Sequence, residues 1–237
     1  MFYILRHRNQ VPVVNFDMTS NLMTALLRPD EFFREQSGKE ATFALPLGIV
    51  LVYGILSAIV GYQMAALMTP MYEVALEGYG SILVIFGAIG GFIGGVIIWI
   101  VASVVFYLLS MLFSGEGSMK KVLEAVAYGM APLIASAAIA VLYLAMIADS
   151  VVTPVIRNIM DPTAAEAAMN AFMTQPVMAD FSLLQAVISV VFMIWAANIW
   201  YFGIQYSRKL SAKNAAITVL VPVGIYLIVI IASYGGI

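Results

Sequence analysis

Residues 81–113 read SILVIFGAIGGFIGGVIIWIVASVVFYLLSMLF, a run without a single charged side chain. A helix over this run would be about 50 Å long at ~1.5 Å per residue. The run has more than the ~20 residues that an α-helix needs to cross the ~30 Å hydrocarbon core of a bilayer. Such a helix must tilt, protrude or begin later than residue 81. The run predicts a transmembrane helix and sets the class of the whole chain.

Four further apolar runs flank this one. They cover residues 41–68, 122–148, 183–206 and 215–234. Each is long enough for a membrane span, so we expect an all-α integral membrane protein, a bundle of five transmembrane helices. The chain is 63% hydrophobic and 10% charged, against ~25% charged residues in soluble domains, which excludes a globular cytosolic protein. We expect one membrane domain over residues 41–237, preceded by a cytoplasmic segment over residues 1–40.

The basic residues lie almost entirely on one side of these five spans. Arg157 is the exception. The others precede the first span or lie between the second and third or the fourth and fifth: Arg6, Arg8, Arg28, Arg34, Lys39, Lys120, Lys121, Arg208, Lys209 and Lys213. Cytoplasmic loops carry an excess of Lys and Arg. We therefore expect the N-terminus in the cytoplasm and the C-terminus outside.

Two short amphipathic helices are expected before the first span. The first ends near Leu27, because the residue before Pro29 avoids the α region. The second starts at Asp30 or Glu31 and carries two phenylalanines. Their apolar faces suit the lipid headgroup region or packing on the cytoplasmic end of the bundle, and both can hold.

Local motifs predict how three further elements begin or bend. Ser37-Gly38-Lys39-Glu40 reads as a capping box before the first span. Pro132 is expected to bend the third span. In the outer loop, residues 149–182, Asp161-Pro162 is a good helix start, and the helix should end near Gln175-Pro176. This outer helix could be a lid, an interfacial foot or a plain connection.

Small residues form strips on the first two spans. Gly87, Gly91 and Gly95 are spaced at i, i+4 and i+8, and Gly90 and Gly94 form a second pair. A flat glycine strip lets another helix backbone approach closely. The first span offers a partner strip, made of Gly54, Ser57, Ala58, Gly61 and Ala65. We expect these strips to pack within one chain, with a homodimer seam or a lipid groove as the alternatives.

The side chains that an intramembrane enzyme needs are missing from the spans. The chain has no cysteine, which removes thiolate catalysis, iron–sulfur clusters and cysteine zinc sites. Its single histidine, His7, lies outside the spans, and no span contains a central aspartate. No Walker-type phosphate loop occurs. We expect no enzyme, no catalytic or metal-binding residue and no cofactor.

Gln63, Glu124 and Asn198 are the candidate polar side chains at membrane depth. Glu124, near Lys121, reads as a solvated acid in the first turn of a helix, where the helix dipole favours it. Asn198, between two tryptophans, reads as an interhelical hydrogen-bonding residue. If all three converged on a cavity, a small transporter or channel would be indicated.

The cytoplasmic motifs follow a recognisable order. They are Leu26-Leu27-Arg28-Pro29-Asp30-Glu31-Phe32-Phe33, the glycine-rich second span, Phe113-Ser114-Gly115-Glu116-Gly117-Ser118-Met119-Lys120-Lys121 with Ala127-Tyr128-Gly129-Met130-Ala131-Pro132, Trp195-x-x-Asn198-Ile199-Trp200, and Ser211-x-Lys213-x-Ala215 with Pro222. This series resembles the Yip domain family, the Ypt/Rab-interacting multi-pass membrane proteins, in the short form of archaea and bacteria. The resemblance covers about residues 20–235, and its most specific part is Gly115 to Pro132.

The resemblance implies five membrane helices and a cytoplasmic N-terminus. It also implies a link to Rab-type GTPases, early secretory membranes and membrane-shape control, often through oligomers. This chain lacks the long cytoplasmic N-terminal domain of eukaryotic relatives, so a Rab-like GTPase is not the expected partner. The family has no agreed catalytic set. The expected location is the cell membrane for a prokaryotic source and an endomembrane for a eukaryotic one.

The leading functional hypothesis is a non-enzymatic membrane scaffold or adaptor. Basic groups near the surface add ~1 kcal/mol each of attraction to anionic headgroups. The candidate contacts to a partner or headgroup are Glu116, Lys120, Lys121, Arg208, Lys209 and Lys213, although these residues could serve orientation alone. Expected partners are the lipid bilayer, a second copy or a cytoplasmic protein, and not nucleic acid. The alternatives are a small transporter, channel or lipid-translocating protein, or a subunit of a larger complex.

Overall fold

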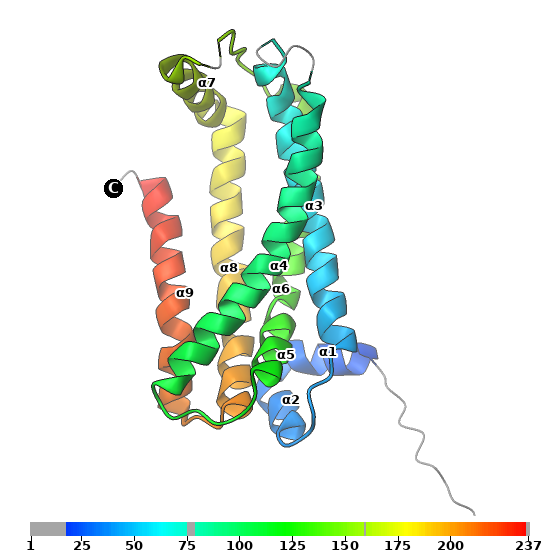
Figure 1. Cartoon of the computed structure of the whole chain (residues 1–237), viewed down its shortest axis with the longest axis vertical. Helices are drawn as coiled ribbons and strands as arrows, with labels where there is room; N and C mark the ends of the chain where they lie inside the picture. The colour runs from blue at the N-terminus through cyan, green and yellow to red at the C-terminus, as the bar shows by residue number, and fades with distance from the viewer. Residues whose placement is uncertain (1–17, 75–78, 159, 236–237) are drawn as a thin grey trace, which may run out of the picture.

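The computed structural model describes residues 18–74, 79–158 and 160–235 (Figure 1). All regular secondary structure in these ranges is helical. The elements are α1 (Met18–Leu27), α2 (Pro29–Gln36), α3 (Ala44–Tyr72), α4 (Ser81–Met111), α5 (Met119–Gly129), α6 (Ala131–Ile147), the short 3-10 helix η1 (Ala148–Ser150), α7 (Pro162–Thr174), α8 (Pro176–Ser207) and α9 (Ala212–Gly235). Five of them, α3, α4, α6 with η1, α8 and α9, are long and apolar enough to cross a membrane. The expected five-span, all-α class is confirmed.

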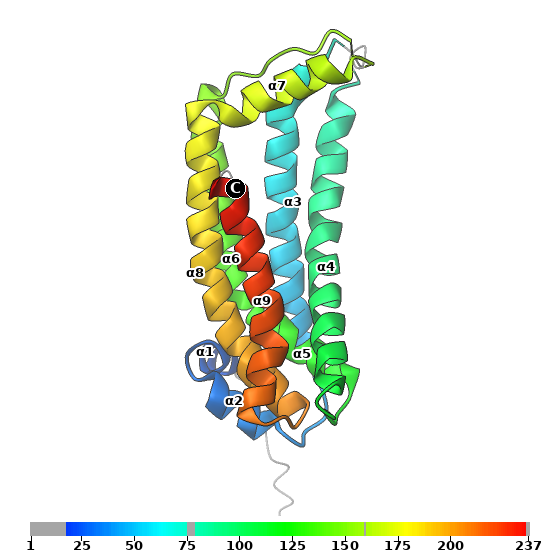
Figure 2. The same ribbon diagram turned by 90° about the vertical axis from the view of Figure 1, so that its left-hand side faces the viewer.

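The long helices run along the long axis of the molecule, and their connections gather at its two ends (Figure 2). One end carries α1, α2, α5 and the loops after α4 and α8. We refer to it as the basic end, because it holds every described Lys and Arg except Arg157. The helix α7 lies across the opposite end, the α7 end. Arg6, Arg8 and His7 lie outside the described residues.

The third predicted span differs most from the expectation. The run over residues 122–148 is divided into α5 and α6 by a break at Met130. Pro132 occupies the second position of α6, where a residue without an N–H donor removes no helical hydrogen bond. Only α6, extended by η1, is long and apolar enough to span the membrane. Pro132 therefore begins a new helix instead of bending one, and α5 becomes a separate helix at the basic end.

The helices α3 and α4 pack through the small residues of both strips. A Cβ atom on Gly61 would lie 2.1 Å from the Gly87 carbonyl oxygen, and one on Gly91 would lie 2.2 Å from the Ser57 carbonyl oxygen. A Cβ on Gly95 would still lie 3.2 Å from an α3 Cα atom. The two backbones touch, so only glycine fits at the closest points.

The second glycine pair does not take part in this contact. A Cβ atom on Gly90 or Gly94 would meet nothing within 4 Å. Gly90 is exposed and Gly94 is partly exposed. The expectation that Gly90 and Gly94 pack a helix of the same chain is therefore corrected: they lie on the face of α4 that points away from α3.

Of the two roles expected for the short N-terminal helices, α2 packs on the bundle and α1 keeps a face suited to the lipid headgroup region. On α2, Phe32 and Phe33 are 3% and 5% exposed, and Phe32 lies 4.8 Å from Tyr128 between ring centroids. On α1, Met23 and Leu27 stay 50% and 66% exposed. The apolar face of α2 thus packs on the bundle, while α1 keeps free apolar side chains of the kind that suit a headgroup layer.

The outer helix α7 starts as expected. The Asp161 carboxylate accepts hydrogen bonds from the backbone N–H groups of Thr163 (3.0 Å) and Ala164 (3.3 Å). Phe172 on α7 is fully buried, and Gln175 exchanges two hydrogen bonds with the Val152 backbone (2.9 and 3.1 Å). The predicted cap is confirmed, and α7 is fixed to its own loop and to the bundle.

The predicted capping box is wrong. Ser37 follows the last residue of α2, and α3 begins only at Ala44. Phe43 precedes α3 and provides no side-chain cap. Glu40 contributes its backbone carbonyl to another contact, described below.

Candidate functional site at the basic end

The loop between α4 and α5 is held by Arg208, the first residue after α8. Arg208 is 2% exposed. Its Nε donates to the Ser110 hydroxyl at 2.8 Å, and its two terminal nitrogens donate to the carbonyl oxygens of Gly115 and Gly117. The guanidinium carbon lies 4.3 Å from the centroid of the Tyr107 ring. We refer to this set of contacts as the Arg208 clamp.

The clamp gives Arg208 a structural role. A buried charge is costly unless its donors are satisfied, and here carbonyls, a hydroxyl and an aromatic face meet the guanidinium. No carboxylate lies within ion-pair distance of it among the described residues. The prediction that Arg208 contacts a partner or a headgroup is corrected accordingly. Sequence reasoning missed the clamp because Arg208 and Lys209 look equivalent in a basic loop.

Three glycines of the motif from Gly115 to Pro132 lie at close contacts in this region. Gly117 has φ +115°, and a Cβ there would lie 2.3 Å from the Ser207 carbonyl oxygen. A Cβ on Gly115 would lie 2.8 Å from the Ser110 carbonyl oxygen, and one on Gly129 would lie 2.1 Å from the Trp200 indole. Glycine is required at these positions because the loop and α5 approach their neighbours closely.

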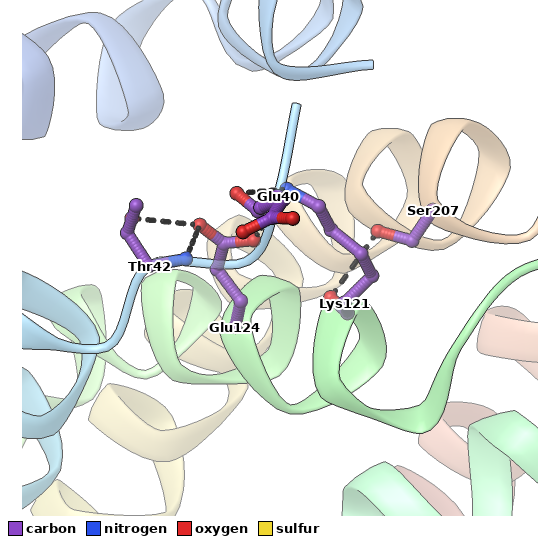
Figure 3. Close-up of polar contacts among 5 residues, drawn as sticks. All are labelled: Glu40, Thr42, Lys121, Glu124 and Ser207. Carbon is purple, nitrogen blue, oxygen red and sulfur yellow. Dashed lines mark hydrogen bonds and ion pairs between the residues drawn. The ribbon is translucent and has the colours of Figure 1, made fainter. Parts of the chain in front are cut away.

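Glu124 forms a second buried connection, shown in Figure 3. It is 4% exposed. Its Oε1 accepts from the backbone N–H (3.1 Å) and the hydroxyl (3.0 Å) of Thr42, and its Oε2 pairs with Lys121 Nζ at 2.8 Å. Lys121 also donates to the Glu40 carbonyl at 3.2 Å. The segment before α3 is thereby fixed to α5.

This arrangement changes the roles of both charged residues. Glu124 was expected to be a solvated acid in the first turn, but it is buried in α5 and satisfied by three donors, as a buried carboxylate requires. Lys121, with a side chain 17% exposed, is its counterion. Burial and, secondarily, the charge of Glu124 raise the pKa of Tyr128 to about 12.

Tryptophan side chains fasten the neighbouring helices to α5. Trp200 donates to the Val126 carbonyl and Trp99 to the Leu123 carbonyl, each at 2.9 Å. Trp200 is only 4% exposed, so it belongs to the core and not to an interfacial aromatic belt. The spacing of tryptophans along α8 could not predict the partner of Trp200, because the Val126 carbonyl lies 74 residues away in the sequence.

The exposed lysines of this end form the basic surface, which we define as Lys39, Lys120, Lys209 and Lys213. All four are exposed. Lys209 forms an ion pair with Glu116 at 3.1 Å, with both side chains about 70% exposed, and such exposed pairs contribute only ~0–1 kcal/mol. The other three form no ion pair within the described residues. Lys39 and Lys209 also line a pocket of about 170 Å³ beside α2.

The polar candidates at membrane depth do not converge. Gln63 donates to the Val141 carbonyl at 3.1 Å between α3 and α6. Asn198 is exposed on α8 and makes no side-chain hydrogen bond to another described helix. Glu124 lies at the basic end. A polar cavity built from these three residues is therefore excluded, and with it the sequence argument for a transporter.

Together, the five spans and the clamped loop define a polytopic α-helical membrane protein with one rigid, basic end. The profile of the Yip1 domain matches residues 23–234. The chain therefore belongs to the Yip1 domain family, as the motifs predicted. It is 36% identical over 121 residues to an uncharacterized protein of Methanocaldococcus jannaschii, covering 51% of this chain and 86% of that relative. No solved structure matches the chain.

Proposed function

We propose that the basic end faces the cytoplasm, so that the N-terminus lies inside and the C-terminus outside. The support is the charge distribution: among the described Lys and Arg residues, Arg157 alone lies at the α7 end. Positive charge is retained on the cytoplasmic side of membrane proteins.

Single cysteines test this orientation, because the natural chain has no cysteine. Ser118 and Met160 are both exposed, at opposite ends. In intact cells, a membrane-impermeant thiol reagent should label Met160→Cys and spare Ser118→Cys, and cell lysis should make both reactive. The reverse pattern in intact cells would show that the basic end faces outward.

We further propose that the protein is a non-enzymatic membrane scaffold that holds an acidic protein partner on its basic surface. The observation that carries this proposal is the Arg208 clamp. It ties the α4–α5 loop, which leads into Lys120 at the start of α5, to the end of α8 beside Lys209, and a preorganised surface loses less conformational freedom on binding. The buried charged groups of the same end, Glu124 and Lys121, are committed to structural contacts, so we assign no catalytic role to them.

The proposal predicts that the triple change Lys39→Glu, Lys120→Glu and Lys213→Glu abolishes co-purification of a partner from native membranes. Each exposed ion pair with an acidic partner contributes up to ~1 kcal/mol, so the loss of three corresponds to a roughly 100-fold weaker association. Thermal stability should stay unchanged, because exposed substitutions shift it by only about ±0.5 kcal/mol. Lys121 is left intact, because its reversal would place a second carboxylate beside Glu124.

The matched control carries Lys→Arg at the same three positions and should keep the partner. Unchanged co-purification by the Glu variant would refute the proposal. Loss of anionic lipid alone, with no protein lost, would instead assign the basic surface to headgroups.

A further inference from the structure

A much larger cavity lies between the spanning helices. Its volume is about 730 Å³, and α3, α4, α6, α8 and α9 form its walls. This volume falls within the ~300–1,000 Å³ of pockets that hold small ligands. Along α8 the lining extends from Phe181 to Trp200, about 28 Å at ~1.5 Å per residue. That length nearly equals the ~30 Å thickness of the hydrocarbon core.

The exposed lining residues lie on α4 and α9, so we place the opening of the cavity between these two helices. These helices meet near the basic end and diverge toward the α7 end in both views (Figures 1 and 2). The lining residues beside the opening are half exposed: Ile97 50%, Val101 52% and Tyr226 44%. Because α4 and α9 are spanning helices, the opening faces the hydrocarbon of the bilayer and not water.

The lining is apolar with a few neutral polar groups. No charged side chain is among the described residues that line it. The polar groups are Tyr53, Ser57, Ser136, Gln185, Ser189 and Tyr226. Ser136 is 7% exposed, and its hydroxyl makes no hydrogen bond within the described part of the chain. Among the described residues, the only buried polar side-chain atom without a partner is Gln63 Oε1, so the Ser136 hydroxyl is open to the cavity that it lines. An occupant with an oxygen atom near Ser136 would give this hydroxyl a hydrogen-bond partner.

We propose that this cavity binds a membrane lipid, with a hydrocarbon chain along α8 and an oxygen of the glycerol region near Ser136. Ser136 lies five residues into α6, about 8 Å along the helix, which is a shallow depth suited to the oxygens just below a headgroup. The absence of charge in the lining disfavours ions and charged solutes, because a charge in this setting needs a paired group. The site is separate from the basic surface, since none of its four lysines lines it.

Photolabelling tests the lipid site. The purified protein is reconstituted in phosphatidylcholine vesicles that contain phosphatidylglycerol with a diazirine in one acyl chain, and adducts are mapped by mass spectrometry. We expect adducts to concentrate on lining residues such as Ile97 and Tyr226, over the more exposed outer face near Leu142. Even labelling of both faces would overturn the proposal.

Filling the cavity provides the matched comparison. Ala137→Phe places a ring in the cavity, whereas Ala135→Phe adds the same ring on the exposed face of the same helix. Labelling of the lining should fall at least tenfold in Ala137→Phe and stay unchanged in Ala135→Phe. Ala102→Phe, on the α4 wall, repeats the test should Ala137→Phe fail to fold, and Ser136→Ala should lower retention of the lipid about fivefold. Unchanged labelling in both filled variants, or a change of oligomeric state with no loss of lipid, would refute a lipid site.

The lipid proposal stands apart from the scaffold proposal in these assays. The triple Lys→Glu variant should lose its protein partner and keep full labelling of the cavity. Ala137→Phe should show the opposite pattern. A failure of either proposal can therefore be recognised without the other.

Discussion

Replacing Arg208 with methionine should destabilise the basic end by about 3 kcal/mol. The variant keeps an unbranched apolar stem but removes every donor to the carbonyls of Gly115 and Gly117 and to the Ser110 hydroxyl. Each buried acceptor left unpaired costs ~1–3 kcal/mol, offset in part by relief from burying the charge. The loop should open, and trypsin should cut after Lys120 faster than in the natural protein.

Two further variants test whether the loss of stability in Arg208→Met comes from the Arg208 clamp. Arg208→Lys should not restore the loop, because an ammonium group cannot reach two carbonyls and a hydroxyl with the fork geometry of a guanidinium. Lys209→Met removes the neighbouring charge, which is exposed and paired only with Glu116, and should change stability by less than about 0.5 kcal/mol. Equal stability and equal cleavage in Arg208→Met and Lys209→Met would contradict the clamp.

Alanine at Gly91 and at Gly90 should have opposite effects on stability. At Gly91 the added methyl would lie 2.2 Å from the Ser57 carbonyl oxygen, so α3 and α4 must move apart. Overpacking of this kind costs ~1–3 kcal/mol or more, and we expect about 3 kcal/mol because the colliding atom belongs to a helix backbone. At Gly90 the methyl meets nothing within 4 Å, and alanine should stabilise the helix by ~0.5–1 kcal/mol.

The stability of the two glycine variants can be measured by unfolding them in detergent with temperature or denaturant, followed by circular dichroism. This one experiment shows whether each variant is more or less stable. The natural protein is the reference for each. A Gly91→Ala variant as stable as Gly90→Ala would show that the spanning helices do not touch through their backbones in the membrane protein.

Several features of the fold could be predicted from local and periodic signals in the sequence. Apolar run length predicted the five spans, and the spacing of Gly87, Gly91 and Gly95 predicted the face of α4 that meets α3, whereas the same spacing gave a wrong expectation for Gly90 and Gly94. Asp161 predicted the start of α7, because a cap depends on residues within one helical turn. All of these signals are local or periodic, and they can be read without knowledge of tertiary contacts.

The features that escaped prediction depend on distant partners. Arg208 became a clamp because the α4–α5 loop folds back over the end of α8. Glu124 became buried because Thr42 and Lys121 reach it from two directions. The break at Met130 allows α5 to receive indole hydrogen bonds from α4 and α8. A run of apolar residues with one proline is compatible with a bent span or with two helices, and only the packing of α5 decides between them.

The scaffold proposal rests on a partner at the basic surface, and site-specific photo-crosslinking in the native membrane tests it most directly. A photoreactive residue at Ser118, exposed beside Lys120, would sample the basic end without removing a lysine of the basic surface, and one at Met160, 85% exposed, would sample the α7 end. We predict one stoichiometric protein adduct from position 118, weakened by Lys39→Glu and Lys213→Glu, and no such adduct from position 160. Adducts from position 118 to lipid or to a second copy alone, or the same adduct from both ends, would contradict a scaffold that acts through its basic surface.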